Sequence, residues 1–472
     1  MVLPAKTCRW SVLSNAAWLF ILNAFPRVSY HRRSAQEWVM FNVLFLARRK
    51  NRRAVVLWFL LSCTVPVSAM GQSQGIWTLE DSIRRVVEIA PEIRGAQAAV
   101  GARQGALQQA GVWPNPQIEL RADDSIGKDA GTGGTDFTQF AISQPLPLSG
   151  RLGHQQAVAG AALDAARAEQ SYQQIRLETQ VAQRYHSLQL ALGRLRLAQQ
   201  RLQLADDLQN TGRRRAQAGE LSELERLRMD LIREAAQQAL NSAEGAYNEA
   251  LSRFRVYLGL SGETTPQLTS LKPFGLVPAL EQLQAGLANH PALLAAKHRV
   301  EAARSGVDLA RAERLPDLSL SVFREQDLLN GRRQDVTGIG LGITIPLWDR
   351  NSGRIGEARA QVIEGQSELQ VLERDLDSRL RQSYLNLNQL VKQGEHYRTR
   401  VFQPAQKVFE LTRKAYASGE VEILSVIDAN NTYFDAHERY LELLQEAWLE
   451  AADLRLAAGR ALVATEQDTD NE

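Results

Sequence analysis

Cysteine, methionine and an excess of either charge are scarce in this 472-residue chain. It has two cysteines and four methionines, and its 55 lysines and arginines nearly balance its 53 aspartates and glutamates. Two cysteines exclude a small fold that is held together by disulfides. The balanced charge argues against a dedicated nucleic-acid-binding protein, which carries a strongly basic face. The length is sufficient for a large buried core.

Long apolar runs are scarce as well. The mean hydropathy of the chain is −0.28. A polytopic helical membrane protein needs several apolar segments of about 20 residues, so the sequence excludes this class. It does not exclude a transmembrane β-barrel, because apolar and polar residues alternate along the strands of a barrel.

Recognisable catalytic and metal-binding motifs are lacking too. The seven histidines are scattered, and none has the His-x-x-x-His or His-Glu-x-x-His spacing that is typical of zinc sites. The sequence contains no phosphate-binding loop and no dinucleotide fingerprint. It therefore predicts a protein without enzymatic activity, cofactor or bound metal.

The N-terminus has the pattern of an export signal. A basic block at 48–53 precedes a short apolar run at 54–61, and small residues lead up to Ala69. This order predicts a secretory signal peptide that is cleaved after Ala69. Met40 is a better start than Met1, so the first 39 residues are interpreted as an extension. Removing 1–69 leaves 45 basic and 52 acidic residues and no cysteine.

Two alternatives for this leader stay open. The apolar run could be a membrane anchor, although it is short for a hydrocarbon core of about 30 Å. The stretch Leu60-Leu61-Ser62-Cys63 loosely resembles a bacterial lipobox, which makes Cys63 a candidate for lipidation.

The rest of the chain is an internal duplication. Three landmarks recur at an offset of 200 residues, namely Pro91 and Pro291, Pro116 and Pro316, and Gly219 and Gly419. A fourth element, Gly150-Arg151-Leu152-Gly153, recurs as Gly353-Arg354-Ile355-Gly356 with a drift of three residues. A constant offset over several landmarks indicates two domain-sized repeats. We place the leader at 1–69, the first repeat at 70–270 and the second repeat at 271–472.

Each repeat is expected to contain two long helices. Alanine, leucine, glutamine, arginine and glutamate, which are good helix formers, dominate the proline-free stretch from Leu148 to Thr265. The predicted helices span about 152–216 and 220–258 in the first repeat, and about 355–417 and 421–464 in the second. The longest would be about 100 Å long. Pro404 is expected to kink the third helix. Helices of this length need lateral partners, as in coiled coils.

Two hairpins are expected before the long helices. Four segments with alternating apolar residues predict strands at about 117–125, 135–145, 317–326 and 335–346. Four strands are too few to close a barrel, which needs about eight or more. Three copies would supply twelve strands, with polar side chains inside and apolar ones toward lipid. Trp113 and Trp348 lie just outside strand ends, where they would form an aromatic girdle or pack in a core.

These motifs resemble the TolC-like outer membrane factors over about 78–464. The two Pro-Leu…Gly-Arg-Leu/Ile-Gly elements and the Gly-Glu turns at 219–220 and 419–420 are the most specific pieces. The form of the element at 346–353 looks most like the CzcC-like branch that serves heavy-metal exporters. The resemblance implies a mainly α fold with a β-barrel part. A homotrimer would form a 12-stranded barrel in outer-membrane lipid, continuous with a helical tunnel through the periplasm of a Gram-negative cell.

The resemblance also implies function and partners. The chain would passively conduct cargo that an inner-membrane pump of the RND type and a periplasmic adaptor deliver, and the expected cargo is divalent heavy-metal cations. Drugs or type I secreted polypeptides are alternative cargoes. A non-conducting, exported coiled-coil scaffold is the alternative from a different class, although a scaffold does not need the four strands.

The resemblance finally assigns roles to residues at the helical tips. Gly219 and Gly419 match the tight interhelical turns where the adaptor docks, together with Glu220 and Glu420. An ordinary helix end without a partner is the other interpretation of these glycines. Asp428 and Ser425 match the stretch that often closes the tunnel, and three copies of Asp428 would form a ring of negative charge. Many relatives carry a second acid in place of Ser425. Asp428 could instead be an ordinary solvated carboxylate.

Overall fold

The computed structural model describes residues 76–123, 137–217, 219, 222–260, 266–329 and 332–460. Clustering of the chain separates residues 1–73 from residues 74–472, and only the second of these units is described below. The proposed cleavage site at Ala69, the alternative start at Met40 and the candidate lipidation site at Cys63 all lie outside the described residues.

The first repeat contains two short helices, one hairpin and two long helices. In chain order these elements are β1 (Ile76–Trp77), α3 (Leu79–Ile89), α4 (Pro91–Ala110), β2 (Gln117–Asp123), β3 (Phe137–Leu146), α5 (Arg151–Gln217) and α6 (Glu223–Leu258).

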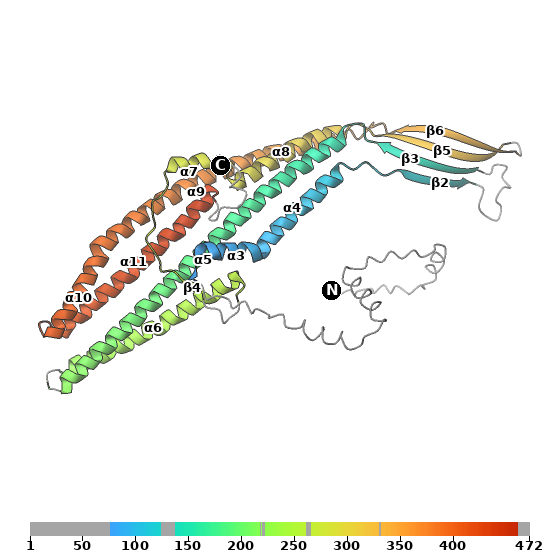
Figure 1. Cartoon of the computed structure of the whole chain (residues 1–472). Helices are drawn as coiled ribbons and strands as arrows, with labels where there is room; N and C mark the ends of the chain where they lie inside the picture. The colour runs from blue at the N-terminus through green and yellow to red at the C-terminus, as the bar shows by residue number, and fades with distance from the viewer. Residues whose placement is uncertain are drawn as a thin grey trace, which may run out of the picture. The chain divides into compact units, whose positions relative to one another are not determined.

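The second repeat follows the same order. After β4 (Gln267–Leu268) at the end of the first repeat, its elements are α7 (Leu280–Gly286), a 3-10 turn (Leu287–Asn289), α8 (Pro291–Ala312), β5 (Leu318–Leu329), β6 (Arg332–Ile343), α9 (Ser352–Tyr397), a π-helical segment (Arg398–Phe402), α10 (Gln403–Ser418) and α11 (Ile423–Ala458). The mainly α fold and its duplicated units are therefore confirmed (Figure 1). No helix in the described part of the chain is both long and apolar enough to cross a membrane.

The helix ends show why the two repeats fold alike. Pro91 and Pro291 occupy the first turns of α4 and α8, where the missing N–H of proline costs nothing. Gly259 and Gly459 end α6 and α11 in the left-handed conformation, with φ angles of 60° and 68°. These two glycines are also 200 residues apart, so the duplication extends to the last helix of each repeat.

The two hairpins join into one antiparallel sheet with the strand order β2-β3-β5-β6. Ile118 pairs with Ile142, Ile142 with Val322, and Val322 with Ile339, so one face is apolar across all four strands. The large side chains of this face are exposed in the protomer: Ile118, Leu120, Phe140, Ile142, Leu320, Val322, Ile339 and Leu341. The sheet lies at one end of the long helices (Figure 1).

The opposite face of the sheet is mostly small or polar, but Phe323 and Val336 lie on it as well. Ser143 pairs with Ser321, and Ser321 pairs with Gly340. Phe323 pairs with Gly338 on this face, where polar side chains were expected. A Cβ atom at Gly338 would come within 2.4 Å of the Phe323 ring, so the absence of a side chain there provides the space for the ring. Strand alternation alone does not reveal this pairing.

The helical core is organised around α5. This helix packs against α4, α6, α8 and α11, so the two repeats meet along it. Tyr185, Leu188 and Phe254 are almost completely buried in the largest apolar cluster, together with residues of α3. At their far end the helices follow one another in the order α6, α5, α11 and α10.

The expected kink at Pro404 takes the form of a π-helical segment. Proline lacks an N–H, and its ring clashes with the carbonyl four residues earlier, that of Arg400. The five residues Arg398–Phe402 relieve this conflict with a wider turn, as π-bulges do inside α-helices. Phe402 then stacks on Tyr440 of α11, with ring centroids 5.2 Å apart.

Candidate functional site

The ends of the long helices that lie far from the sheet form two turns (Figure 1). The turn at Gly219 between α5 and α6 is called the first tip, and the turn at Gly419 between α10 and α11 the second tip. Gly219 has a φ of 78° and Gly419 a φ of 81°. Residues with a side chain rarely adopt this left-handed conformation, so glycine is required at both tips.

The second tip closes with a complete Schellman motif. The Gly419 amide donates to the Tyr416 carbonyl at 3.1 Å, and the Glu420 amide donates to the Ala415 carbonyl at 2.8 Å. The Gly219 amide makes the corresponding bond to the Ala216 carbonyl at 3.0 Å. The side chain of Glu420 is exposed, whereas Glu220 lies outside the described residues.

The helices that leave the two tips begin differently. Ser222 and Glu225 form a capping box at the start of α6, because each side chain accepts a hydrogen bond from the other residue's amide, at 3.3 Å and 3.0 Å. At the equivalent positions of α11, the order of residue types is reversed to Glu422 and Ser425. Glu422 makes no side-chain capping bond. The start of α11 therefore lacks a stabilising feature that α6 has.

Asp428 and Ser425 lie on the same exposed face of α11. The opposite face of this turn is buried, because Val426 packs against Leu208 of α5 and Met229 of α6. Among the described residues, Asp428 forms no ion pair and no side-chain hydrogen bond. The structure thus brings both gate candidates together on an open face. The equivalent position in the first repeat carries Arg228, so the two tips have opposite charges here.

The two tips are joined by a contact that the sequence did not indicate. Arg215 near the end of α5 donates to the Tyr416 carbonyl at 3.2 Å, and its guanidinium lies 4.7 Å from the centre of the Tyr416 ring. A cation over an aromatic ring is attracted to the electron-rich face. This contact links the first tip to the second within one protomer.

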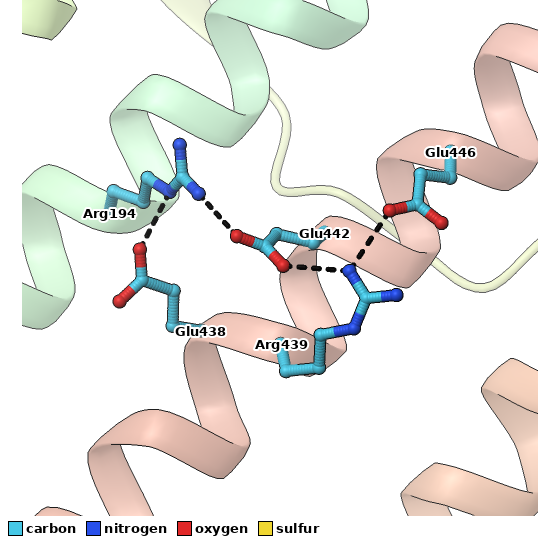
Figure 2. Close-up of polar contacts among 5 residues, drawn as sticks. All are labelled: Arg194, Glu438, Arg439, Glu442 and Glu446. Carbon is cyan, nitrogen blue, oxygen red and sulfur yellow. Dashed lines mark hydrogen bonds and ion pairs between the residues drawn. The ribbon is translucent and has the colours of Figure 1, made fainter.

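A charged network links α5 to α11 nearer the middle of the helices (Figure 2). Arg194 of α5 lies 3.0 Å from Glu438 and 2.5 Å from Glu442, and Arg439 bridges Glu442 and Glu446 at 2.8 Å and 3.0 Å. The Arg194 Nε–H is not directed at Glu438, so that contact is an ion pair rather than a hydrogen bond. The hydrogen bond from Arg439 and the nearby Arg194 charge lower the pKa of Glu442. In the sequence, the four-residue spacing of Glu438, Glu442 and Glu446 indicates only that these side chains share one face of a helix.

A buried histidine packs where α5 of the first repeat meets α11 of the second repeat. His186 of α5 stacks on Trp448 of α11 with ring centroids 4.9 Å apart, and its Nδ1 lies 2.9 Å from the side chain of Gln189. Gln189 and Trp448 in turn donate to the carbonyls of Thr269 and Lys272 at 2.8 Å each. Burial lowers the pKa of His186 to about 4. The histidine is therefore neutral at ordinary pH and acts as part of the packing.

The remaining predictions concern the two tryptophans near the strand ends and the absence of a metal site. Trp113 and Trp348 are 55% and 92% exposed in the protomer, so neither packs in its core. The described residues include no group of three or more histidine, cysteine, aspartate and glutamate side chains that could hold a metal ion.

Comparison with known protein families finds a match in both repeats. A family model described as outer membrane efflux protein matches residues 83–260 and again residues 283–460. The two matches are 200 residues apart, at the offset of the sequence landmarks. Together they cover most of the chain.

Individual relatives point to one branch. The cobalt-zinc-cadmium resistance protein CzcC of Cupriavidus metallidurans is 25% identical over 393 residues, which cover 82% of this chain and 91% of the relative. The nickel and cobalt resistance protein CnrC of the same organism is 25% identical over 61% of this chain and 68% of its own length. The solved structure of CusC has a TM-score of 0.64 at 19% identity and covers 81% of this chain and 92% of that one.

Proposed function

Since the chain belongs to the outer membrane efflux protein family, we propose that it forms the exit duct of a tripartite system for divalent heavy-metal cations. The duct would be a homotrimer with its strands in outer-membrane lipid and its helices in the periplasm. It would receive cargo from an inner-membrane pump of the RND type through a periplasmic adaptor, and it would conduct passively.

The apolar face of the sheet is the observation that carries this proposal. Its large side chains are exposed in the protomer, whereas the opposite face presents serine, glutamine and glycine. Within the described residues, the outer strands β2 and β6 each pair on one side only. An open sheet with two free edges is prone to aggregation unless another chain completes it. Three copies joined edge to edge would form a closed barrel with an apolar exterior and a polar interior.

The helical edges support the same assembly. α6 and α10 are the outermost helices of the far end. Exposed apolar residues lie three, four and seven residues apart on α6, and three and seven residues apart on α10 and the π-helical segment before it, as in coiled coils. On α6 these residues are Leu224, Leu227 and Leu231, and on α10 with its π-helical segment they are Val401, Val408 and Leu411. We propose that the α6 edge of one copy packs against the α10 edge of the next. Contacts between two different edges close into a ring of three copies if each contact rotates the next copy by one third of a turn.

The cargo proposal rests on the relatives and on Asp428. The relatives CzcC and CnrC are resistance proteins for cobalt, zinc, cadmium and nickel. Three copies of Asp428 around a three-fold axis would place three negative charges at the narrow end of the duct. Rings of carboxylates favour cations over anions in pores. The second tip, with Gly419 and Glu420 exposed beside it, would be the docking point for the adaptor, together with the first tip at Gly219 and Glu220.

Purified mature protein in planar lipid bilayers tests the duct. We expect a trimer that opens cation-selective pores, observed as single-channel currents and a reversal potential in a salt gradient. A chain that stays soluble and monomeric without pores would contradict the proposal and leave the scaffold alternative.

Cargo is tested separately, in cells that lack their own duct but retain a metal pump and its adaptor. The proposal predicts restored resistance to cobalt, zinc or cadmium when the chain is expressed. Restored resistance to dyes and drugs alone, or restored polypeptide secretion alone, would instead support one of the other cargoes.

A further inference from the structure

A groove between α8 and α9 combines positive charge with an apolar floor. It has a volume of about 500 Å³. Arg304, Arg311 and Arg359 line it together with three apolar residues, Val307, Val362 and Ile363, which are called its floor below. Ile363 is 65% exposed, whereas Val307 is only 8% exposed, so Ile363 is the most accessible part of the floor in the protomer. An anionic lipid combines a charged headgroup with apolar chains and so matches both parts of this lining.

The positive charge of the groove is only partly neutralised. Asp308 is the acidic side chain that lines it, and this carboxylate pairs with Arg311 at 2.9 Å. Arg304 and Arg359 form no ion pair or side-chain hydrogen bond with any described residue. Three arginines and one aspartate leave two positive charges on the groove. Two guanidinium groups are thus available for an anionic ligand such as a phosphate.

The groove lies where the helices meet the sheet. Arg311 is the second-last residue of α8 and precedes the start of β5 by seven residues, and Arg359 follows the start of α9 by seven residues. The exposed apolar face of the sheet begins directly beyond these helix ends (Figure 1). Phosphate headgroups occupy the layer next to the hydrocarbon core of a bilayer, and long arginine side chains reach toward this layer.

The first repeat shows that the fold does not require such a groove. The residues at the positions of Arg304 and Arg311 are Gln104 and Gly111 at the offset of 200. Gln156 occupies the position of Arg359 at the local offset of 203 set by the Gly-Arg-Leu/Ile-Gly landmark. The side chain of Gln156 covers Gly111, since a Cβ atom there would lie 2.0 Å from its Nε2. The equivalent place is therefore uncharged, and a side chain fills it.

We propose that this groove binds an anionic phospholipid, with the phosphate between Arg304, Arg311 and Arg359 and the acyl chain on the exposed side chain of Ile363. The inference rests on the proposed placement of the sheet in the outer membrane. The lipid would fasten the second repeat to the inner leaflet at the level where α8 and α9 leave the sheet. The first repeat would make no such contact.

Native mass spectrometry of the purified mature protein tests this site. The protein is released from micelles that contain equal amounts of phosphatidylglycerol and phosphatidylcholine. We expect bound phosphatidylglycerol in preference to phosphatidylcholine on the wild-type protein. Each of Arg304→Gln, Arg311→Gln and Arg359→Gln should weaken this binding by about fivefold, because a basic residue near an anionic lipid contributes about that much. The triple variant should lose the preference.

Matched controls separate the groove from the overall charge. A triple variant with Arg213→Gln, Arg214→Gln and Arg228→Gln removes the same charge near the first tip and should bind phosphatidylglycerol like the wild type. Ile363→Gln should weaken phosphatidylglycerol binding although all three arginines remain. A large excess of inorganic phosphate should not displace the lipid, because phosphate does not use the apolar floor. Complete displacement by phosphate would overturn the assignment to a lipid.

The proposal is overturned if the groove variants bind phosphatidylglycerol as well as the wild type, or if the tip control loses binding equally. A second result would also overturn it: the wild type shows no preference for phosphatidylglycerol, and the triple groove variant dissociates from trimers into monomers. That result would mean that a neighbouring copy of the chain covers the groove. The groove lies within one protomer, so wild-type monomers report on lipid binding as well as trimers do. A wild type that binds lipid but never forms trimers counts against the proposed duct and not against the groove.

Discussion

The first and second tips occupy equivalent positions in the two repeats, but they differ in helix capping and in side-chain charge. Both turns require a left-handed glycine, at Gly219 and Gly419, and both place an apolar turn of helix against α5. The first tip adds a capping box and the basic Arg228, whereas the second has an uncapped helix start and the acidic Asp428. The turn geometry is therefore common to both repeats, whereas the side chains around the two tips differ in capping and in charge.

The largest expected effect concerns the joint between the repeats rather than the tips. Asn386 occupies the position equivalent to His186, so only the first repeat has a titratable group there. A histidine with an unfolded pKa near 6.5 and a folded pKa of about 4 stabilises the fold above pH 6.5. This stability is lost as the pH falls from about 6.5 to about 4, because the unfolded chain binds the proton more strongly. The total loss is about 3 kcal/mol.

Urea unfolding of the purified protein, followed by tryptophan fluorescence between pH 7.5 and pH 4.5, measures this loss. The variant His186→Asn, which copies the second repeat, should show a smaller decrease in stability over this range. An equal decrease in both proteins would show that His186 does not titrate as its burial implies.

Substitution of the tip glycines is the next largest change. Gly219→Ala and Gly419→Ala should each destabilise the local turn by about 1–2 kcal/mol, because a side chain is strained at these φ angles. Hydrogen–deuterium exchange of the flanking helices measures this local stability. Gly245→Ala in the middle of α6 is the matched control, since nothing lies within 4 Å of a Cβ atom there. We expect the control to be stabilised slightly, and equal loosening in all three variants would contradict the turn assignment.

Capping distinguishes the two tips more finely. Ser222→Ala should destabilise the start of α6 by about 1 kcal/mol, because it removes a bonded N-cap. Glu422→Ala should leave the start of α11 nearly unchanged, because Glu422 makes no side-chain capping bond. The double variant Glu422→Ser/Ser425→Glu would build the missing capping box and slow exchange at the start of α11. Equal responses of α6 and α11 to the two alanine variants would remove the proposed difference between the tips.

The smallest expected effect is that of the network in Figure 2. Arg194→Gln breaks its contacts with Glu438 and Glu442 and should destabilise the α5–α11 contact by about 0.5–1 kcal/mol, since the arginine is partly exposed. The loss should shrink at high salt concentration. Arg196→Gln is the control, because Arg196 is exposed and forms no ion pair with a described residue. Thermal unfolding at low and high salt compares the two variants, and an equal, salt-independent loss would contradict the role of the network.

The parts of the fold that follow from local pattern could be predicted from the sequence. Proline at the helix starts, glycine at the turns and alternation in the strands each act within a few residues. Because the chain is duplicated at an offset of 200 residues, these local patterns occur twice. The helix start predicted at Pro91, for example, was supported by the same pattern at Pro291. The resemblance to heavy-metal exporters, drawn from the element at 346–353, agrees with the relatives found.

Features that depend on long-range packing could not be predicted. Arg194 and Glu442 are 248 residues apart, and only the packing of α5 on α11 brings them together. Phe323 interrupts the polar face of the sheet because Gly338, on the neighbouring strand, leaves room for its ring. The difference between the tips was within reach, because aligning the repeats places Ser222 against Glu422 and Arg228 against Asp428. The gate and docking roles of Ser425, Asp428 and the tip residues remain predictions.

Ion selectivity of single channels tests the central claim, that the second tip gates the duct, most directly. Wild-type protein, Asp428→Ala and the matched first-tip variant Arg228→Ala are compared in planar bilayers under a salt gradient. The account predicts that Asp428→Ala lowers the preference for cations and alters the conductance, whereas Arg228→Ala changes neither. Channels in which Asp428→Ala behaves like the wild type, or in which Arg228→Ala has the larger effect, would contradict it.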